Sequence, residues 1–212
     1  MIAFWALAFV LTALQSPSER VYRVGAGVSA PRLIYRAEPA YPQAARDAKV
    51  QGAVVLYAVI DSNGSTRDRK VVRGLGFGLD EAALDAVSEW LFRPGMKDGK
   101  AVPVAATIEV NFRLAVQGHQ GAQQVCAGAP QASSAQAIQT LANLGNANAQ
   151  YVMGCAAFRG VPPDYVLAHM WFDLAAGQGL QKAARSRDAV ALKMTLEQMS
   201  EAQARARAWK PS

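Results

Sequence analysis

The chain has 212 residues, which is enough for one medium-sized domain or two small ones. Hydrophobic residues make up 51% and charged residues 18% of it, which excludes an intrinsically disordered polyelectrolyte. The net charge of +6 is spread along the chain, and its densest basic stretch, Arg67 to Arg73, has no interleaved aromatic side chains. This pattern favours a solvated strand face over a nucleic-acid-binding surface.

The first residues form an uncharged apolar run, IAFWALAFVLTAL, at positions 2–14. The run is about as long as the hydrophobic region of a signal peptide and shorter than the ~20 residues that a helix needs to cross a bilayer. We expect residues 1–15 to be a signal peptide, with a short membrane anchor as the alternative. The protein then contacts a membrane only through this segment, and only if the segment is retained.

A short helix followed by a hairpin is predicted over residues 42–73. Pro42 suits the first turn of a helix, and so short a helix must pack on something to be stable. The following run, GAVVLYAVI at 52–60, is apolar on both alternating faces, which predicts a strand that is central or covered on both sides. The Asn-Gly turn in DSNGS at 61–65 predicts a hairpin, with a short return strand near residues 69–73.

A second helix is predicted to begin with Asp80 as its N-cap, supported by a contact between Leu79 and Leu84. Apolar residues at helical spacing continue to Leu91, and Pro94-Gly95 ends the run. The preceding GLGFG at 74–78 is similar to a phosphate-binding loop. However, Leu79 stands where that motif needs a third glycine, and acidic residues follow it, so we interpret the segment as a connector.

The last predicted strand of this region, residues 103–114, alternates cleanly between apolar and polar side chains. Such alternation is typical of a half-buried antiparallel strand, and in a sheet of about three strands it is expected at the edge. An edge strand presents unpaired N–H and C=O groups that another extended chain can complete. The residues expected to face outward and to form a partner-binding edge are Ala105, Thr107, Glu109, Asn111 and Arg113.

Taken in order and spacing, residues 32–115 resemble the C-terminal domain of the TonB family. The resemblance rests on a Pro-x-Tyr-Pro entry with two alanines, a glycine that opens the long strand, a glycine in the turn, and Leu-Asp-x-Ala-Ala followed by Trp-x-Phe-x-Pro. The residues that carry these motifs are Pro39, Tyr41, Pro42, Ala44, Ala45, Gly52, Gly64, Leu79, Asp80, Ala82, Ala83, Trp90, Phe92, Pro94, Gly99, Pro103 and Val104.

The resemblance implies a non-catalytic periplasmic role, in which the domain captures an extended segment of an outer-membrane receptor as an added strand. It implies inner-membrane motor proteins as further partners. However, residues 2–14 contain no histidine of the kind that couples to the motor, and only ~20 residues separate this run from the domain. The resemblance as a whole leads us to expect a role in energy-coupled transport or, given these two departures, a periplasmic adaptor role. The alternative is a scaffold whose sheet edge is closed by homodimerisation.

A Gly-, Gln-, Ala- and Ser-rich stretch at 117–134 is interpreted as a linker between a domain at 20–116 and a helical module at 135–210. Helices are predicted over 135–144, 147–158, 164–177, 181–194 and 197–209. Residues 145–185 resemble a single Sel-one-like repeat, a relative of tetratricopeptide repeats, with flanking helices as caps. The fold class is thus α+β: a two-layer domain with a three-stranded antiparallel sheet and two helices, followed by an all-α repeat module that would bind a second protein.

The sequence offers few residues for catalysis or for metal binding. His119 and His169 are the only histidines, and no Cys, His or carboxylate cluster has metal-ligand spacing. Cys126 and Cys155 are expected to form a disulfide in an oxidising compartment, with a buried Cys155 and an incidental Cys126 thiol as the alternative. A nucleophilic pair of His169 and Cys155 is less consistent with the pattern than a buried helical histidine. We expect neither a cofactor, a metal nor an enzymatic activity.

Overall fold

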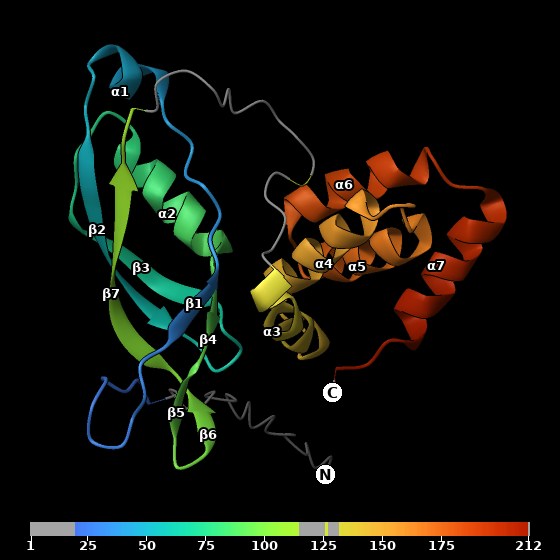
Figure 1. Ribbon diagram of the computed structural model, residues 1–212, viewed down its shortest axis with the longest axis horizontal. Helices are drawn as coiled ribbons and strands as arrows, with labels where there is room; N and C mark the ends of the chain where they lie inside the picture. The colour runs from blue at the N-terminus through green and yellow to red at the C-terminus, as the bar shows by residue number, and fades with distance from the viewer. Residues whose placement is uncertain (1–19, 115–125, 127–131, 212) are drawn as a thin grey trace, which may run out of the picture.

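The computed structural model describes residues 20–114, 126 and 132–211, and it divides into a mixed α+β domain and a helical module (Figure 1). The elements of the first part are β1 (Arg32–Tyr35), α1 (Gln43–Asp47), β2 (Gly52–Ile60), β3 (Thr66–Arg73), α2 (Leu79–Glu89), β4 (Leu91–Arg93), β5 (Gly95–Lys97), β6 (Lys100–Val102) and β7 (Val104–Phe112). The helical module contains α3 (Ala132–Asn143), α4 (Ala147–Arg159), α5 (Tyr165–Gly177), α6 (Gln181–Ala191) and α7 (Leu196–Ala208). This architecture confirms the predicted fold class.

The central sheet has three antiparallel strands in the order β3-β2-β7. Strand β2 is the middle strand, which explains its largely apolar sequence. Its side chains on one face, Val54, Leu56, Ala58 and Ile60, have no exposed surface and pack against α2. On the other face Tyr57 is 36% exposed, so that face is only partly covered. The strand is therefore central rather than covered on both sides.

The predicted hairpin between β2 and β3 is present, and its turn is fixed by Gly64. Asp61 and Ser65 pair through the Asp61 N–H, and Gly64 has a φ of +81°. A Cβ atom at Gly64 would lie 2.2 Å from the carbonyl oxygen of Phe92, so glycine is required here for space as well as for its backbone conformation. The return strand begins at Thr66, earlier than the sequence predicted, because Ile60 and Thr66 pair directly beside the turn.

Helix α2 differs from its prediction at both ends. Its N-cap is Gly78, and Asp80 is the second residue of the helix, where its carboxylate accepts hydrogen bonds from the N–H groups of Leu75 and Gly76. The helix ends at Glu89, because Trp90 is extended and Leu91–Arg93 form β4. The apolar spacing that suggested a longer helix arises because Leu91 is buried against the helical module rather than against the sheet.

Two small ribbons that the sequence did not predict flank the central sheet. β1 pairs with β4, and β5 pairs with β6, both in antiparallel fashion. Both lie toward the same end of the domain in Figure 1, below α2 and beside the lower part of β7. Each strand has only three or four residues. Such short segments carry too few residues for a recognisable alternation.

The five helices of the second part agree with the predicted ranges to within about one turn. Asn146 caps α4, Asp164 caps α5, and Thr195 forms a capping box with Gln198 at the start of α7. Helix α3 begins at Ala132, so the predicted linker ends earlier than residue 134. The remainder of that linker, except Cys126, and the predicted signal peptide or anchor at 1–15 lie outside the described residues.

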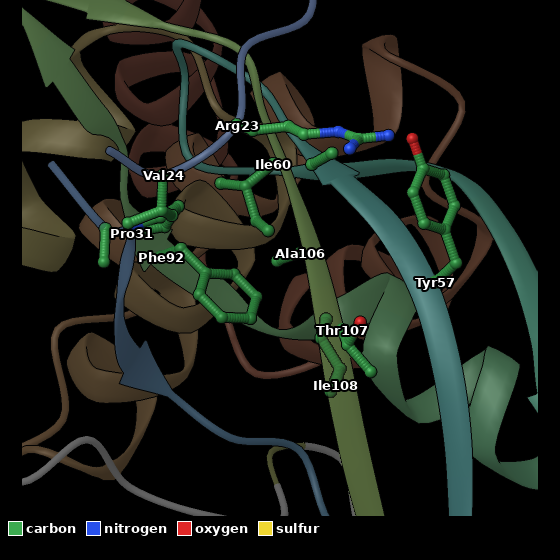
Figure 2. A pocket seen from close by; sticks show the side chains of 11 residues that line it. Arg23, Val24, Pro31, Tyr57, Ile60, Phe92, Ala106, Thr107 and Ile108 are labelled. Carbon is green, nitrogen blue, oxygen red and sulfur yellow. The ribbon is translucent and has the colours of Figure 1, made fainter. Parts of the chain in front are cut away.

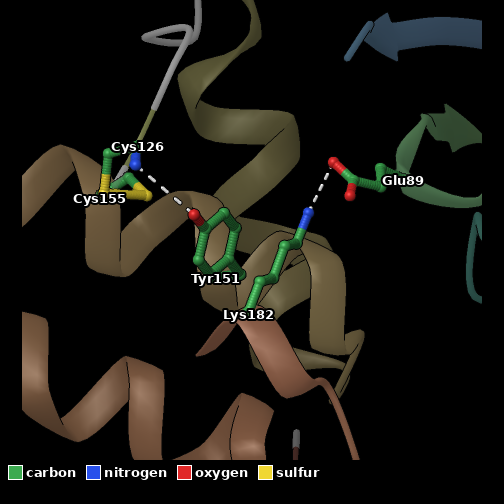
Figure 3. The surroundings of a disulfide bond; sticks show 5 residues. All are labelled: Glu89, Cys126, Tyr151, Cys155 and Lys182. Carbon is green, nitrogen blue, oxygen red and sulfur yellow. Dashed lines mark hydrogen bonds and ion pairs between the residues drawn. A yellow bond between two sulfur atoms is a disulfide. The ribbon is translucent and has the colours of Figure 1, made fainter. Parts of the chain in front are cut away.

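Cys126 and Cys155 form a disulfide, which confirms the predicted pairing (Figure 3). The bond joins the segment before α3 to the middle of α4, and both residues are buried beside Phe172. The N–H of Cys126 also donates to the hydroxyl of Tyr151, with 3.4 Å between the two atoms. Cys126 is therefore joined to α4 at two points, Cys155 and Tyr151.

The helical module packs directly on the first domain, at the hairpin end of the sheet. Leu91 from β4 is fully buried in a cluster with Ile138, Leu141 and Trp171, and Leu141 contacts the hairpin turn at Gly64. Asn146 is 1% exposed, and its amide nitrogen donates to the carbonyl of Asn63 and to Ser65 Oγ, both at 2.9 Å. Because the same side chain caps α4, one buried residue joins the helix start to the hairpin.

A charged contact extends this interface (Figure 3). Lys182 of α6 lies with Nζ 2.6 Å from a carboxylate oxygen of Glu89 and 4.4 Å from the centre of the Tyr151 ring. Burial lowers the pKa of Lys182, and the neighbouring Glu89 carboxylate opposes that shift. Burial, with a smaller contribution from Glu89, raises the pKa of Tyr35 to about 12.

Within the described residues, no helix has the length and apolar character that a membrane-spanning helix requires.

We predict that Asn146→Ala lowers the free energy of unfolding by roughly 2 kcal/mol, because it removes a helix cap and leaves buried hydrogen-bonding groups of the hairpin unpaired. Urea denaturation of the full chain measures this loss. The matched variant is Asn146→Asp, which keeps the cap acceptor for the Ala149 N–H but loses the amide donors to the hairpin. Wild-type stability together with unchanged amide resonances at 61–65 in Asn146→Asp would contradict the role of Asn146 in docking.

Candidate functional site

The candidate site is the outer edge of β7, the edge that faces away from β2. All nine residues of β7 pair with β2 in one continuous register, from Val104 opposite Ile60 to Phe112 opposite Gly52. The N–H of Ala105 points outward, since it donates to a residue outside this sheet, Tyr22. Backbone groups alternate between the two edges of a strand. The N–H and C=O groups of the odd-numbered residues of β7 therefore point outward, and those of the even-numbered residues bond to β2.

The five residues predicted for the edge are all odd-numbered. Ala105, Thr107, Glu109 and Asn111 lie within β7, and Arg113 follows its last residue; their role in partner binding remains a prediction. Thr107, Glu109 and Asn111 are exposed, whereas Val104, Ile108, Val110 and Phe112 on the opposite face are buried. Among the described residues, no hydrogen bond reaches the outward N–H groups of Thr107, Glu109, Asn111 and Arg113. The same holds for the outward carbonyl groups of residues 105, 107, 109 and 111.

One of the five is already engaged. The N–H of Ala105 donates to the carbonyl of Tyr22, and the N–H of Tyr22 donates to the carbonyl of Pro103, both at 2.9 Å. This pairing was not predicted, because a single backbone contact leaves no pattern in side-chain types. The open part of the edge therefore begins after the N–H of Ala105.

The opposite edge of the sheet, β3, is poorly suited to accept a strand. Its pairing with β2 shifts register twice, and Asp68 within it has a φ of +51°. Five of its eight residues are charged, although Val71 and Val72 are exposed as well, and Arg67 bonds to Asp61 and Asp68 at 2.6 Å. Irregular register and dense charge are the features by which natural edge strands avoid pairing. The regular edge of β7 has neither feature.

A cavity of about 610 Å³ lies beside the first half of β7 (Figure 2). Ile60 and Phe92 form its apolar base, and β7 contributes residues 105–108. Figure 2 shows Val24 and Pro31 on the same side of β7 as Phe92, with Tyr57 on the other side and the Arg23 side chain reaching across the strand. The sequence analysis missed Arg23, Val24 and Pro31, since they belong to a segment with no periodic pattern.

The residues that carry the family motif support the fold around this edge rather than lining its open part. The Tyr41 ring meets Phe112 edge-on at 5.7 Å, and its hydroxyl donates to the carbonyl of Val50. Trp90 donates from Nε1 to the carbonyl of Ala37 at 2.9 Å. Of the predicted motif set, Phe92 alone lines the cavity, while Pro39, Pro42, Gly52 and Pro94 lie outside it.

The described residues provide no arrangement for nucleophilic catalysis by His169 and Cys155. Cys155 is held in the disulfide, and burial lowers the pKa of His169, which is 4% exposed. Within the described ranges, no group of three or more His, Cys, Asp or Glu residues is placed to hold a metal ion. His169 is therefore a buried helical histidine, as the sequence favoured.

Comparison with known proteins finds a family match for the segment that bears this edge. Residues 37–114 match the family model for the Gram-negative bacterial TonB protein C-terminal domain. This segment is therefore similar to a TonB C-terminal domain. It includes α1, the whole central sheet and β7, so the matched family segment and the candidate edge coincide.

Two curated relatives match part of the chain. The chain is 32% identical over 93 residues to Protein TonB of Vibrio cholerae serotype O1, a match that covers 43% of this chain and 37% of the relative. It is 36% identical over 77 residues to Protein TonB of Xanthomonas campestris pv. campestris, covering 36% of this chain and 34% of the relative. The chain thus spans only about a third of the length of these relatives.

One solved structure is similar as well, the solution NMR structure of the TonB C-terminal domain of Pseudomonas aeruginosa. The identity is 22%, and the match covers 46% of this chain and 97% of that one, with a TM-score of 0.36.

We predict that amide hydrogen exchange in the full chain distinguishes the two edges of β7. The amides of Ala106, Ile108 and Val110 should exchange at least tenfold more slowly than those of Thr107, Glu109 and Asn111, because only the even-numbered amides bond to β2. NMR-detected exchange measures each residue separately. Equal protection of both sets would mean that another segment already covers the outer edge.

Proposed function

We propose that this chain is a non-enzymatic cell-envelope protein whose TonB C-terminal domain binds an extended segment of a partner protein by strand addition to β7. The observation that carries the proposal is the regular outer edge from Thr107 to Arg113, with its backbone donors and acceptors unpaired among the described residues. An added strand gains affinity from main-chain hydrogen bonds and specificity from pockets for alternate side chains. The cavity at Phe92 and Ile60 lies where one such side chain would enter.

The partner class follows from the domain. Its matched relatives are TonB proteins, and the resemblance implies an extended segment of an outer-membrane receptor as the ligand. We propose the periplasm as the location, or the inner membrane facing the periplasm if the N-terminal segment is retained. Motor proteins of the inner membrane are proposed partners in that second case. Receptor-linked transport and a periplasmic adaptor role both use the same edge.

We propose that the helical module provides a second surface for a protein partner. Its helix pairs are consistent with a Sel-one-like repeat over residues 145–185, with α3 and α7 as caps. The module occupies the hairpin end of the sheet, away from the open part of β7, so its docking leaves the proposed edge accessible (Figure 1). The functional units are then the domain at 20–116 and the module at 135–210, joined by the linker.

Glu109→Pro tests strand addition. Proline removes an outward N–H and places its ring where a partner strand would lie, while the even-numbered residues keep the ladder to β2 intact. Titration of the labelled full chain with synthetic peptides copied from the extended N-terminal segments of outer-membrane receptors of the same cell should shift the amides of residues 107–113. We expect Glu109→Pro to weaken this binding at least tenfold.

The control variant is Glu109→Ala, which changes the side chain and keeps the backbone donor. It should bind the peptides within about threefold of the wild type, because the main chain supplies most of the contacts. Equal binding by Glu109→Pro and the wild type, or a complete absence of shifts at 107–113 with every peptide, would refute strand addition at this edge.

A second copy of the chain is the alternative occupant of the edge. If two β7 strands paired antiparallel with Asn111 opposite Asn111, Glu109 of one copy would face Arg113 of the other, which is a favourable cross-strand pair. Sedimentation of the full chain separates the two cases. A monomer at micromolar concentration is expected for peptide capture, whereas a tight dimer that Glu109→Pro dissociates would favour the scaffold with a closed edge.

A further inference from the structure

The N-terminal segment of the described chain closes one end of the proposed edge. Tyr22 lies parallel to β7 opposite Val104, and it bonds to the carbonyl of Pro103 and the N–H of Ala105 at 2.9 Å each. These are the first outward groups at the start of β7. A partner strand cannot use them while Tyr22 does, since each is already satisfied.

This pairing stops after one residue. To continue it, residue 24 would have to bond to the carbonyl of Ala105 and the N–H of Thr107, in the alternation of a parallel ladder. Instead Gly25 and Val28 bond to each other in both directions, at 3.1 and 3.0 Å, and this turn leads the chain away from β7. Glycine at position 25 accommodates a φ of +111° in this turn.

Further contacts hold the segment in place. Ser29 donates from its N–H to the carbonyl of Met96 at 2.9 Å and accepts from the N–H of Met96 on its hydroxyl at 2.8 Å. The Nζ atom of Lys97 lies 4.8 Å from the centre of the Tyr22 ring. The segment is thus attached to β5 as well as to β7, and it forms a fixed boundary rather than a loose end.

We infer that Tyr22 sets the register of strand addition, a positioning role that rests on the proposed function of the same edge. A partner strand starts at the carbonyl of Ala105 and the N–H of Thr107 and ends at the N–H of Arg113. With alternate residues bonding, this stretch accommodates a segment of about seven residues. A longer segment gains no further hydrogen bonds at the start of β7 unless it displaces Tyr22.

Hydrogen exchange of the free protein tests the boundary. In the wild type the Ala105 amide should be protected, although Thr107, Glu109 and Asn111 on the same edge are not. Tyr22→Pro removes the donor to Pro103 and places a ring there. Because this breaks one of the two bonds that hold residue 22 against β7, the remaining bond from the Ala105 N–H to the residue-22 carbonyl should open more often, and exchange at Ala105 should be at least tenfold faster. Tyr22→Ala is the matched control, because it keeps the backbone donor and loses only the ring beside Lys97. Ala105 exchange as fast as that of Thr107 in the wild type would overturn the inference.

Peptide titration tests the register itself. The probes are the receptor peptides described above, each in a seven-residue form and in a form extended by two residues at the end that approaches Ala105. In the wild type both forms should bind within about twofold of each other and leave the Ala105 amide protected. In Tyr22→Pro the extended form should bind at least fivefold more tightly and protect Ala105 again.

The outcomes separate this inference from the proposed function. If the peptides shift residues 107–113 and the extended form also gains affinity in the wild type, strand addition holds and the register role of Tyr22 is refuted. If no peptide shifts any amide from 107 to 113, the proposed function itself fails, and the register role falls with it. Should Tyr22→Pro fail to fold, the wild-type comparison of the two peptide lengths decides the matter alone.

Discussion

The structure depends on the uninterrupted pairing of β2 with β7. This ladder keeps one register over nine residues. The backbone groups of the even-numbered residues of β7 therefore bond to β2, and their side chains face the core. The backbone groups of the odd-numbered residues consequently point to the outer edge, and their side chains point away from the core. A single register shift would exchange the two sets and place Phe112 and Val110 in solvent. The buried even-numbered side chains therefore fix which backbone groups face a partner.

The two ends of the sheet have different relations to the rest of the chain. At the hairpin end, the helical module covers the turn through Asn146 and buries Leu91 of β4. At the other end α1 packs near the start of β2, where Ala45 is fully buried. Neither contact involves the open residues of β7. The module thus adds a surface to the domain without covering the regular edge, and the Lys182–Glu89 contact extends the same interface.

Much of the fold could be predicted because its signals are local. The alternation of residues 103–114, the Asn-Gly turn and the helical periodicities of the second module each reflect one element packing on one face. The boundary of α2 was wrong for a physical reason. Leu91 continues the apolar spacing of the helix, but its burial is supplied by Ile138 and Leu141, which are distant in sequence. Spacing alone does not reveal which segment buries a side chain.

The candidate site was predictable in part. The five edge residues follow from alternation, whereas Tyr22, Val24 and Pro31 had no signal in the sequence. Tyr22 meets β7 through backbone bonds, and Val24 and Pro31 reach the cavity from a segment with no periodic pattern. The docking of the module through Asn146 was also hidden. Asparagine before a helix indicates a cap, and that role is present, but the second role of its amide at Asn63 depends on tertiary position.

Backbone recognition explains why an edge of this kind needs a defined boundary. Main-chain hydrogen bonds carry little sequence information, so a regular strand can pair with many extended segments in several registers. Side-chain pockets are one source of selectivity, and the cavity beside residues 105–108 supplies one. A fixed starting point is another, because it determines which partner side chain meets that cavity. Tyr22 lies directly before the cavity-lining residues of β7, so the boundary and the pocket act on the same first residues of an added strand.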